Sequence, residues 1–201
     1  MIDKIIEIEW DMFQSTNNKG GRAACQDNFP TFNIMRRAQF MSWPTNIVES
    51  YYNDILEAKS NDKNLLMEKY LRMMEYSSPE EYNEKKGYLT VLTDYNKKLV
   101  NDLTDILIDD SVNTDKKHPS VTQKGRPIYS KDDNNGLTSI QTYLKGELST
   151  YSIHTLELFD TYVRSLLNKG LSYNELVLEN TSKLYGFNNL KELEEKVNGN
   201  S

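Results

Sequence analysis

Three ionisable side chains occupy positions where the helical pattern of the sequence calls for apolar residues. Glu9 falls near the centre of the apolar face of a helix predicted over 2–16. Arg36 interrupts an aromatic stripe on the next helix, and Glu147 projects from an apolar face much later in the chain. Burying an unpaired charge is strongly unfavourable, so each needs a partner or a wet cavity. We expect either a structural ion pair or one ligand pocket lined by all three, and the sequence leaves both open.

A pocket built from these residues would suit acid–base chemistry on an anionic, carboxylate-bearing substrate. A carboxyl group whose pKa is raised by burial can act as general acid or base, a role we assign to Glu9 or Glu147, with Tyr143 assisting. A guanidinium matches a carboxylate through two parallel hydrogen bonds, so Arg22 and Arg36 would clamp the anion. The residues predicted to bind substrate are Gly20, Gly21, Arg22, Arg36, Gln39 and Arg126.

The segment 17–27 favours anion binding. Gly20 and Gly21 let the backbone adopt positive φ angles and approach a ligand closely, and Arg22 follows at once. The next helix starts just beyond, with unpaired N–H groups and the positive end of its dipole. An ordinary helix–helix turn is the alternative. The segment is neither a Walker A loop nor a dinucleotide-binding glycine motif, and we expect no cofactor.

Cys25, the single cysteine, is a candidate nucleophile. A helix N-terminus and a nearby arginine would both lower the pKa of its thiol. His118 lies in a polar stretch and His154 falls opposite the apolar stripe of its helix, so neither is well placed as a base. A buried structural cysteine is the alternative. One cysteine excludes an internal disulfide and a cysteine-based zinc site, and without any Glu-x-x-His pair we expect no metal.

Composition bounds the class of protein. At 201 residues the chain fits one helical domain, 1–201. Its formal net charge is −6, with both signs interspersed and no basic stripe, which argues against nucleic-acid and anionic-membrane partners. The N-terminus is an amphipathic helix rather than a signal peptide, and no apolar run approaches membrane-spanning length. We expect a cytoplasmic protein that binds a small anionic molecule. Its oligomeric state stays open, a homodimer included.

The hydrophobic spacing predicts an all-α fold, a single compact bundle of about eight helices. Clear amphipathic patterns cover 65–76 and 152–170, with Asn64 and Ser152 as N-caps. From 111 to 137 the periodicity disappears in a stretch rich in Asp, Asn, Lys and Ser. An irregular connection of this length is usually a lid over a site or a disordered insert, and both stay open.

Longer motifs run nearly end to end. They are Glu9-Trp10-x-x-Phe13, Gly20-Gly21-Arg22-Ala23 with Cys25-Gln26-Asp27, Phe32-x-Ile34-Met35-Arg36-x-x-Gln39-Phe40, Asn64-Leu65-Leu66, Lys69-Tyr70, Met73-Met74, Arg126-Pro127, Thr142-Tyr143-Leu144-x-Gly146-Glu147-Leu148-x-Thr150-Tyr151-Ser152, and Leu184-Tyr185-Gly186. By these motifs the chain resembles an uncharacterised bacterial family, the domain of unknown function number four-one-two-five. The Asn- and Asp-rich stretches 113–117 and 132–136 depart from it. The resemblance implies no particular activity, cofactor or catalytic residue.

Two classes of function fit these observations. The first is a small-molecule enzyme without a cofactor, a lyase, isomerase or hydrolase. The second is a non-catalytic ligand-binding or scaffold protein. An enzyme needs a carboxylate within about 3 Å of a substrate proton, whereas a scaffold would hold its buried charges paired in a dry core.

Overall fold

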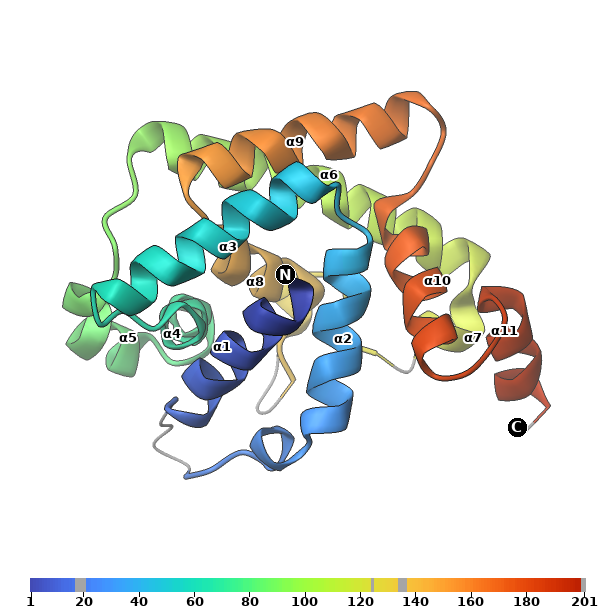
Figure 1. Ribbon diagram of the computed structural model, residues 1–201, viewed down its shortest axis with the longest axis horizontal. Coiled ribbons are helices and arrows are strands. Elements are labelled where there is room, and N and C mark those ends of the chain that lie inside the picture. The colour runs from blue at the N-terminus through green and yellow to red at the C-terminus, as the bar shows by residue number, and fades with distance from the viewer. Residues whose placement is uncertain (17–20, 124, 134–136, 200–201) are drawn as a thin grey trace.

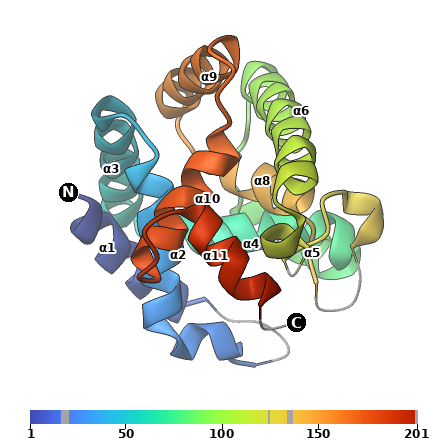
Figure 2. The same ribbon diagram turned by 90° about the vertical axis from the view of Figure 1, so that its right-hand side faces the viewer.

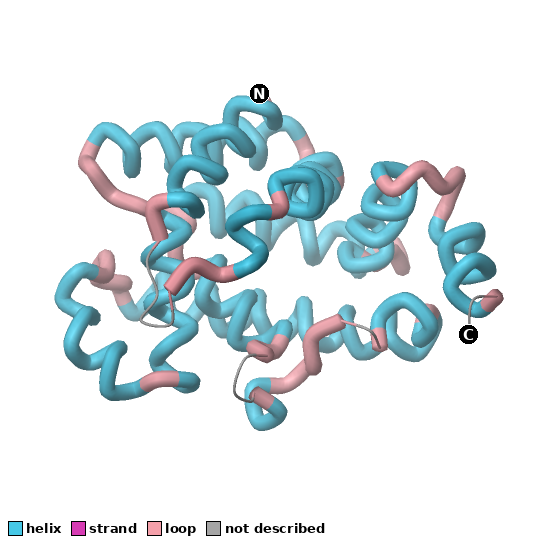
Figure 3. The backbone as a smooth tube through the Cα atoms, turned by 90° about the horizontal axis from the view of Figure 1, so that it is seen from below, coloured by secondary structure: helices cyan, strands magenta, loops and turns pink. Residues whose placement is uncertain are grey.

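The computed structural model describes residues 1–16, 21–123, 125–133 and 137–199. Every regular element within these ranges is a helix (Figure 3), which confirms the all-α prediction. The predicted count of about eight is wrong, because the described ranges hold eleven α-helices. In chain order they are α1 (Ile2–Gln14), α2 (Phe29–Met41), α3 (Thr45–Ser60), α4 (Leu65–Ser77), α5 (Pro79–Lys85), α6 (Asp94–Lys117), α7 (Pro119–Thr122), α8 (Ile140–Leu148), α9 (Ile153–Asn168), α10 (Tyr173–Leu184) and α11 (Leu190–Asn198). Short 3₁₀ helices are η1 (Ala24–Asp27), η2 (Lys86–Tyr88) and η3 (Ser130–Asp132).

Polar side chains fix where several helices begin. Asn28, Asn64, Ser139 and Ser152 each accept a hydrogen bond from the backbone N–H three residues further on. Such a bond satisfies one of the N–H groups that the first helical turn leaves without a partner. The N-caps predicted at Asn64 and Ser152 are therefore confirmed, and the sequence locates the starts of α4 and α9 correctly.

The core is assembled from helices far apart in the chain. α9 packs against both α3 and α6, and α1 contacts α2, α3 and α4 (Figures 1 and 2). Five completely buried residues, one from each of five helices, are Ile5, Phe40, Ile55, Leu103 and Leu156. α7, α10 and α11 gather at the end of the molecule where the C-terminus lies (Figure 1). Among the described residues, no helix has the length and hydrophobicity that crossing a membrane requires.

The stretch 111–137 is more regular than predicted. α6 continues to Lys117, and within it the buried hydroxyls of Ser111 and Thr114 find acceptors in carbonyls four residues earlier, each at 2.8 Å. Because polar side chains occupy the buried positions here, the spacing of apolar residues does not reveal the helix. α7 then packs against α11, and within the described residues no hydrogen bond or ion pair joins Arg22 to 125–133. For residues 123–137 the lid and disordered-insert hypotheses stay predictions, and 124 and 134–136 lie outside the described residues.

At Gly146, α8 lies directly against α4. A Cβ atom there would lie 2.8 Å from Met73 Cγ and 2.9 Å from the backbone carbonyl oxygen of Lys69. Gly146→Ala should therefore lower the free energy of unfolding by about 1–3 kcal/mol, although alanine is the better helix former. Urea unfolding measures this change. Gly87→Ala is the control, because no atom lies within 4 Å of its Cβ position, and a similar loss there would contradict the packing argument.

Candidate functional site

The three ionisable residues that interrupt apolar faces meet inside the helical bundle. Arg36 donates from Nε and Nη2 to the two carboxylate oxygens of Glu9, at 2.7 and 2.5 Å. Its Nη1 donates to Glu147 Oε1 at 2.8 Å. Glu9 is completely buried, and Arg36 and Glu147 are 6% and 5% exposed. The predicted burial and pairing of these residues are confirmed.

A second cation completes this cluster. Lys69 Nζ lies 3.4 Å from Glu147 Oε2, and its side chain is also buried. We call Glu9, Arg36, Lys69 and Glu147 the buried charge network, in which two acids balance two bases. Neutral groups add further hydrogen bonds to the acids: Tyr51 donates to Glu9 at 2.7 Å, and Tyr151 and Gln39 donate to Glu147 at 2.7 and 2.8 Å. The network ties α1, α2, α3, α4 and α8 together.

Electrostatics keep Glu147 and Lys69 ionised. Burial alone would raise the pKa of Glu147, but attraction to Arg36 and Lys69 outweighs it and holds the pKa well below its usual range. Burial would lower the pKa of Lys69, but attraction to Tyr143 and Glu147 raises it above the ordinary lysine value. The expectation that burial raises the pKa of Glu147 is therefore wrong, because its cationic partners are buried with it.

Tyr143 and Arg126 extend the network toward the surface. Lys69 Nζ donates to the Tyr143 hydroxyl at 2.8 Å, and the partly exposed ring of Tyr143 lies beneath the Arg126 guanidinium, 5.1 Å from Cζ to centroid. Arg126 is exposed and donates to the Thr138 carbonyl oxygen at 2.8 Å. Two residues predicted for catalysis and substrate binding thus lie side by side with one face toward solvent.

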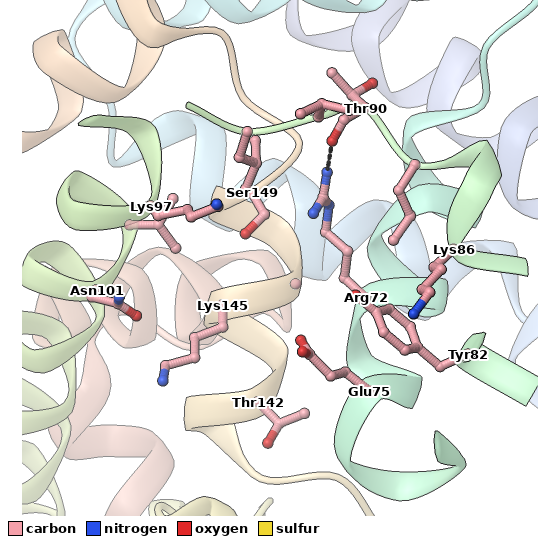
Figure 4. A pocket seen from close by; sticks show the side chains of 15 residues that line it. Arg72, Glu75, Tyr82, Lys86, Thr90, Lys97, Asn101, Thr142, Lys145 and Ser149 are labelled. Carbon is pink, nitrogen blue, oxygen red and sulfur yellow. Dashed lines mark hydrogen bonds between the residues drawn. The ribbon is translucent and has the colours of Figure 1, made fainter. Parts of the chain in front are cut away.

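A cleft of about 470 Å³ is lined by residues of α4, α5, α6 and α8 (Figure 4). In this view α8 lies between α4 and α6. Apart from Thr90, the polar lining of the cleft comes from side chains three or four residues apart, which a helix places on one face. These are Arg72 and Glu75 of α4, Tyr82 of α5 with Lys86 of η2, Lys97 and Asn101 of α6, and Thr142, Lys145 and Ser149 in and after α8. Four of them are cations and one is an acid.

The cations of the cleft differ in how firmly they are held. Arg72 Nη2 donates to Glu68 Oε1 and to the Thr90 carbonyl oxygen, each at 2.6 Å. Lys97 lies 3.4 Å from the fully exposed Asp94, a weak pair. The Lys145 side chain forms no hydrogen bond or ion pair within the part of the chain that the structure describes. Lys86 donates to Asn83 Oδ1 at 2.8 Å. The cleft therefore combines cations that neighbouring residues hold with one, Lys145, whose ammonium is free to meet a ligand.

The chain matches the family described as "Protein of unknown function (DUF4125)" over residues 1–195. The chain belongs to this family. No curated protein and no solved structure matches it significantly. Within the described residues of this family member, no group of three or more His, Cys, Asp or Glu side chains is placed to hold a metal ion.

In this member of the family, Arg22 is occupied by its own loop. It donates to Asp27 Oδ1 and to the Gln26 carbonyl oxygen, each at 2.8 Å, and also to Gln14. Gly21 has the expected positive φ of 84°, whereas Gly20 lies outside the described residues. None of the partners of Arg22 is shared with Arg36, so the structure does not bring the two arginines to one anion.

Cys25 does not have the surroundings of a buried structural cysteine. It lies exposed on η1, which corrects the alternative that placed it in the core. Neither His118 nor His154 hydrogen-bonds to it among the described residues, because His118 faces Glu194 at 3.1 Å and His154 is exposed on α9. Its role as a nucleophile stays a prediction without an adjacent base.

Two parts of the site were missed by reasoning from sequence. Lys69, like Glu9, is a charged residue at a helical position where the pattern calls for an apolar one. It stands three residues after Leu66 and four before Met73, which are both buried on the inner face of α4. The cleft has a weaker signal. Pairs such as Lys97 and Asn101, spaced by four, are indistinguishable from an ordinary solvated helix face until another helix is placed opposite them.

Proposed function

We propose that the protein binds a small anionic molecule in the cleft between α4, α5, α6 and α8. The observation that carries this proposal is the cationic lining of the cleft, Arg72, Lys86, Lys97 and Lys145 against Glu75, in a chain of net charge −6. A cleft in which one sign of charge predominates concentrates ligands of the opposite sign. Its volume of about 470 Å³ lies within the range of roughly 300–1,000 Å³ usual for small-molecule sites. A single cysteine suits a reducing compartment, and we propose a cytoplasmic location.

The buried charge network has a different role in this proposal. Its acids and bases already satisfy one another, so an incoming anion would have to displace Glu9 or Glu147 from Arg36. Leaving either acid buried without its partner is strongly unfavourable. The network is better suited to holding α4 and α8 at the spacing that shapes the cleft, since Lys69 and Glu147 stand on those two helices.

Charge reversal at Lys145 tests the proposal. In a thermal-shift screen of carboxylates, phosphates and amino acids, the wild type should be stabilised by an anion, and Lys145→Glu should lose that stabilisation. Lys145 has no ion-pair partner among the described residues, so this variant should fold normally. Lys4→Glu makes the same change in net charge on an exposed residue outside the cleft and should keep the stabilisation. If Arg22→Ala abolished it instead, the loop 17–27 would be the anion site.

An acid–base enzyme is the second candidate, with Glu9, Glu147 and Tyr143 as its catalytic groups. The observation in its favour is the partly exposed Tyr143, whose hydroxyl accepts from Lys69 Nζ at 2.8 Å while Arg126 lies over its ring. A hydroxyl held by an ammonium group is a fitting arrangement for proton transfer. Turnover of any ligand from the screen that disappears in Tyr143→Phe, with folding unchanged, would favour this candidate.

A further inference from the structure

We propose that the ligand of the cleft is a phosphomonoester that also carries an amino group, an inference that rests on the proposed function. The cleft is not uniformly positive. The Glu75 carboxylate enters it from α4, across from the Lys97 ammonium on α6 (Figure 4). A ligand that satisfies both ends must carry a negative and a positive group.

The wall formed by α6 and α8 suits the phosphate. Lys97 and Lys145 supply two flexible ammonium groups, and the side chains of Ser149 and Asn101 form no hydrogen bond within the described residues. A planar carboxylate is best matched by a free guanidinium fork, but Arg72, the single arginine of the lining, is already bound to Glu68 and Thr90. Two point charges with neutral donors are better suited to a tetrahedral dianion.

The opposite wall suits the amino group. The Glu75 carboxylate forms no hydrogen bond or ion pair among the described residues, although cations line the cleft around it. A purely anionic ligand would be repelled by this carboxylate, whereas a ligand ammonium would give it the partner that it lacks. The Tyr82 hydroxyl also lines the cleft without a hydrogen bond in the described structure. The unpaired acid therefore selects the second group of the ligand.

Three small molecules test the phosphate and the amino group of the proposed ligand separately. Phosphoethanolamine carries both groups, 2-hydroxyethyl phosphate replaces the amine by a hydroxyl, and β-alanine replaces the phosphate by a carboxylate. By calorimetry the wild type should bind phosphoethanolamine about two- to fivefold more tightly than 2-hydroxyethyl phosphate, as expected for one exposed ion pair. β-Alanine should bind more weakly than phosphoethanolamine. Glu75→Gln should remove the preference for the amine and leave or improve binding of 2-hydroxyethyl phosphate, while Glu49→Gln, an exposed residue outside the cleft, should change neither.

The outcomes distinguish this inference from the proposed function. Equal affinity for the two phosphates in the wild type, or a preference that survives Glu75→Gln, would overturn the amine assignment while anion binding stands. Tighter binding of β-alanine than of phosphoethanolamine would overturn the phosphate assignment. If none of the three probes binds, the inference fails. The proposed function fails with it only if the anion screen also gives no stabilisation that depends on Lys145.

Discussion

Arg36→Met should lower the free energy of unfolding by about 3–5 kcal/mol, because it leaves two buried carboxylates without their main cation. Glu9 would keep a hydrogen bond from Tyr51, and Glu147 would keep Lys69 at 3.4 Å. Methionine fills much of the same volume, so the loss comes from charge rather than from a cavity. Urea unfolding at neutral pH measures this change.

Arg37→Met provides the matched control. Arg37 follows Arg36 on the same helix and undergoes the same substitution. Its partner Asp3 is exposed, so the free energy of unfolding should change little. Adding Glu9→Gln to Arg36→Met removes one stranded charge and should restore part of the lost stability. A loss at Arg36 no larger than that at Arg37 would mean that the buried charge network does not hold the bundle together.

The location of the network could be predicted from sequence because burial and charge conflict at single positions. Glu9, Arg36 and Glu147 each interrupt an apolar face, and a charge on such a face must find a partner. What the pattern cannot give is the identity of that partner. Lys69 decides the ionisation of Glu147, and only packing of α4 against α8 brings the two within 3.4 Å. The predicted direction of the pKa shift was wrong for this reason.

Buried polar residues also limited how well the helices could be predicted from the sequence. The helical period was predicted to disappear from residue 111, since the last turns of α6 bury Ser111 and Thr114 rather than apolar side chains. Capping residues, by contrast, act through bonds to their own neighbours, so Asn64 and Ser152 could be placed correctly. Local chemistry is visible in a sequence, whereas contacts between distant helices, including those that form the cleft, are not.

The second large effect expected is a dependence of stability on pH that comes from Glu147. Its pKa is held far below the ordinary glutamate value of about 4.3 by Arg36 and Lys69. Above about pH 4.3, Glu147 is ionised in both the folded and the unfolded protein, and its full contribution to stability is present. As the pH falls below it, the unfolded chain takes up a proton that the folded protein resists, so acid favours unfolding.

Glu147→Gln isolates this contribution. At neutral pH the variant should be less stable than the wild type by several kcal/mol, because Arg36 and Lys69 lose an acid that they share. Glutamine does not titrate, so the gap between the two proteins should narrow by about 1.4 kcal/mol for each pH unit below about pH 4. Urea unfolding between about pH 6 and pH 3 follows the gap, and Glu49→Gln, an exposed residue, should show none at any pH. A gap that stays constant as the pH falls would mean that Glu147 is held by shape alone, and that its charge contributes nothing to the stability of the fold.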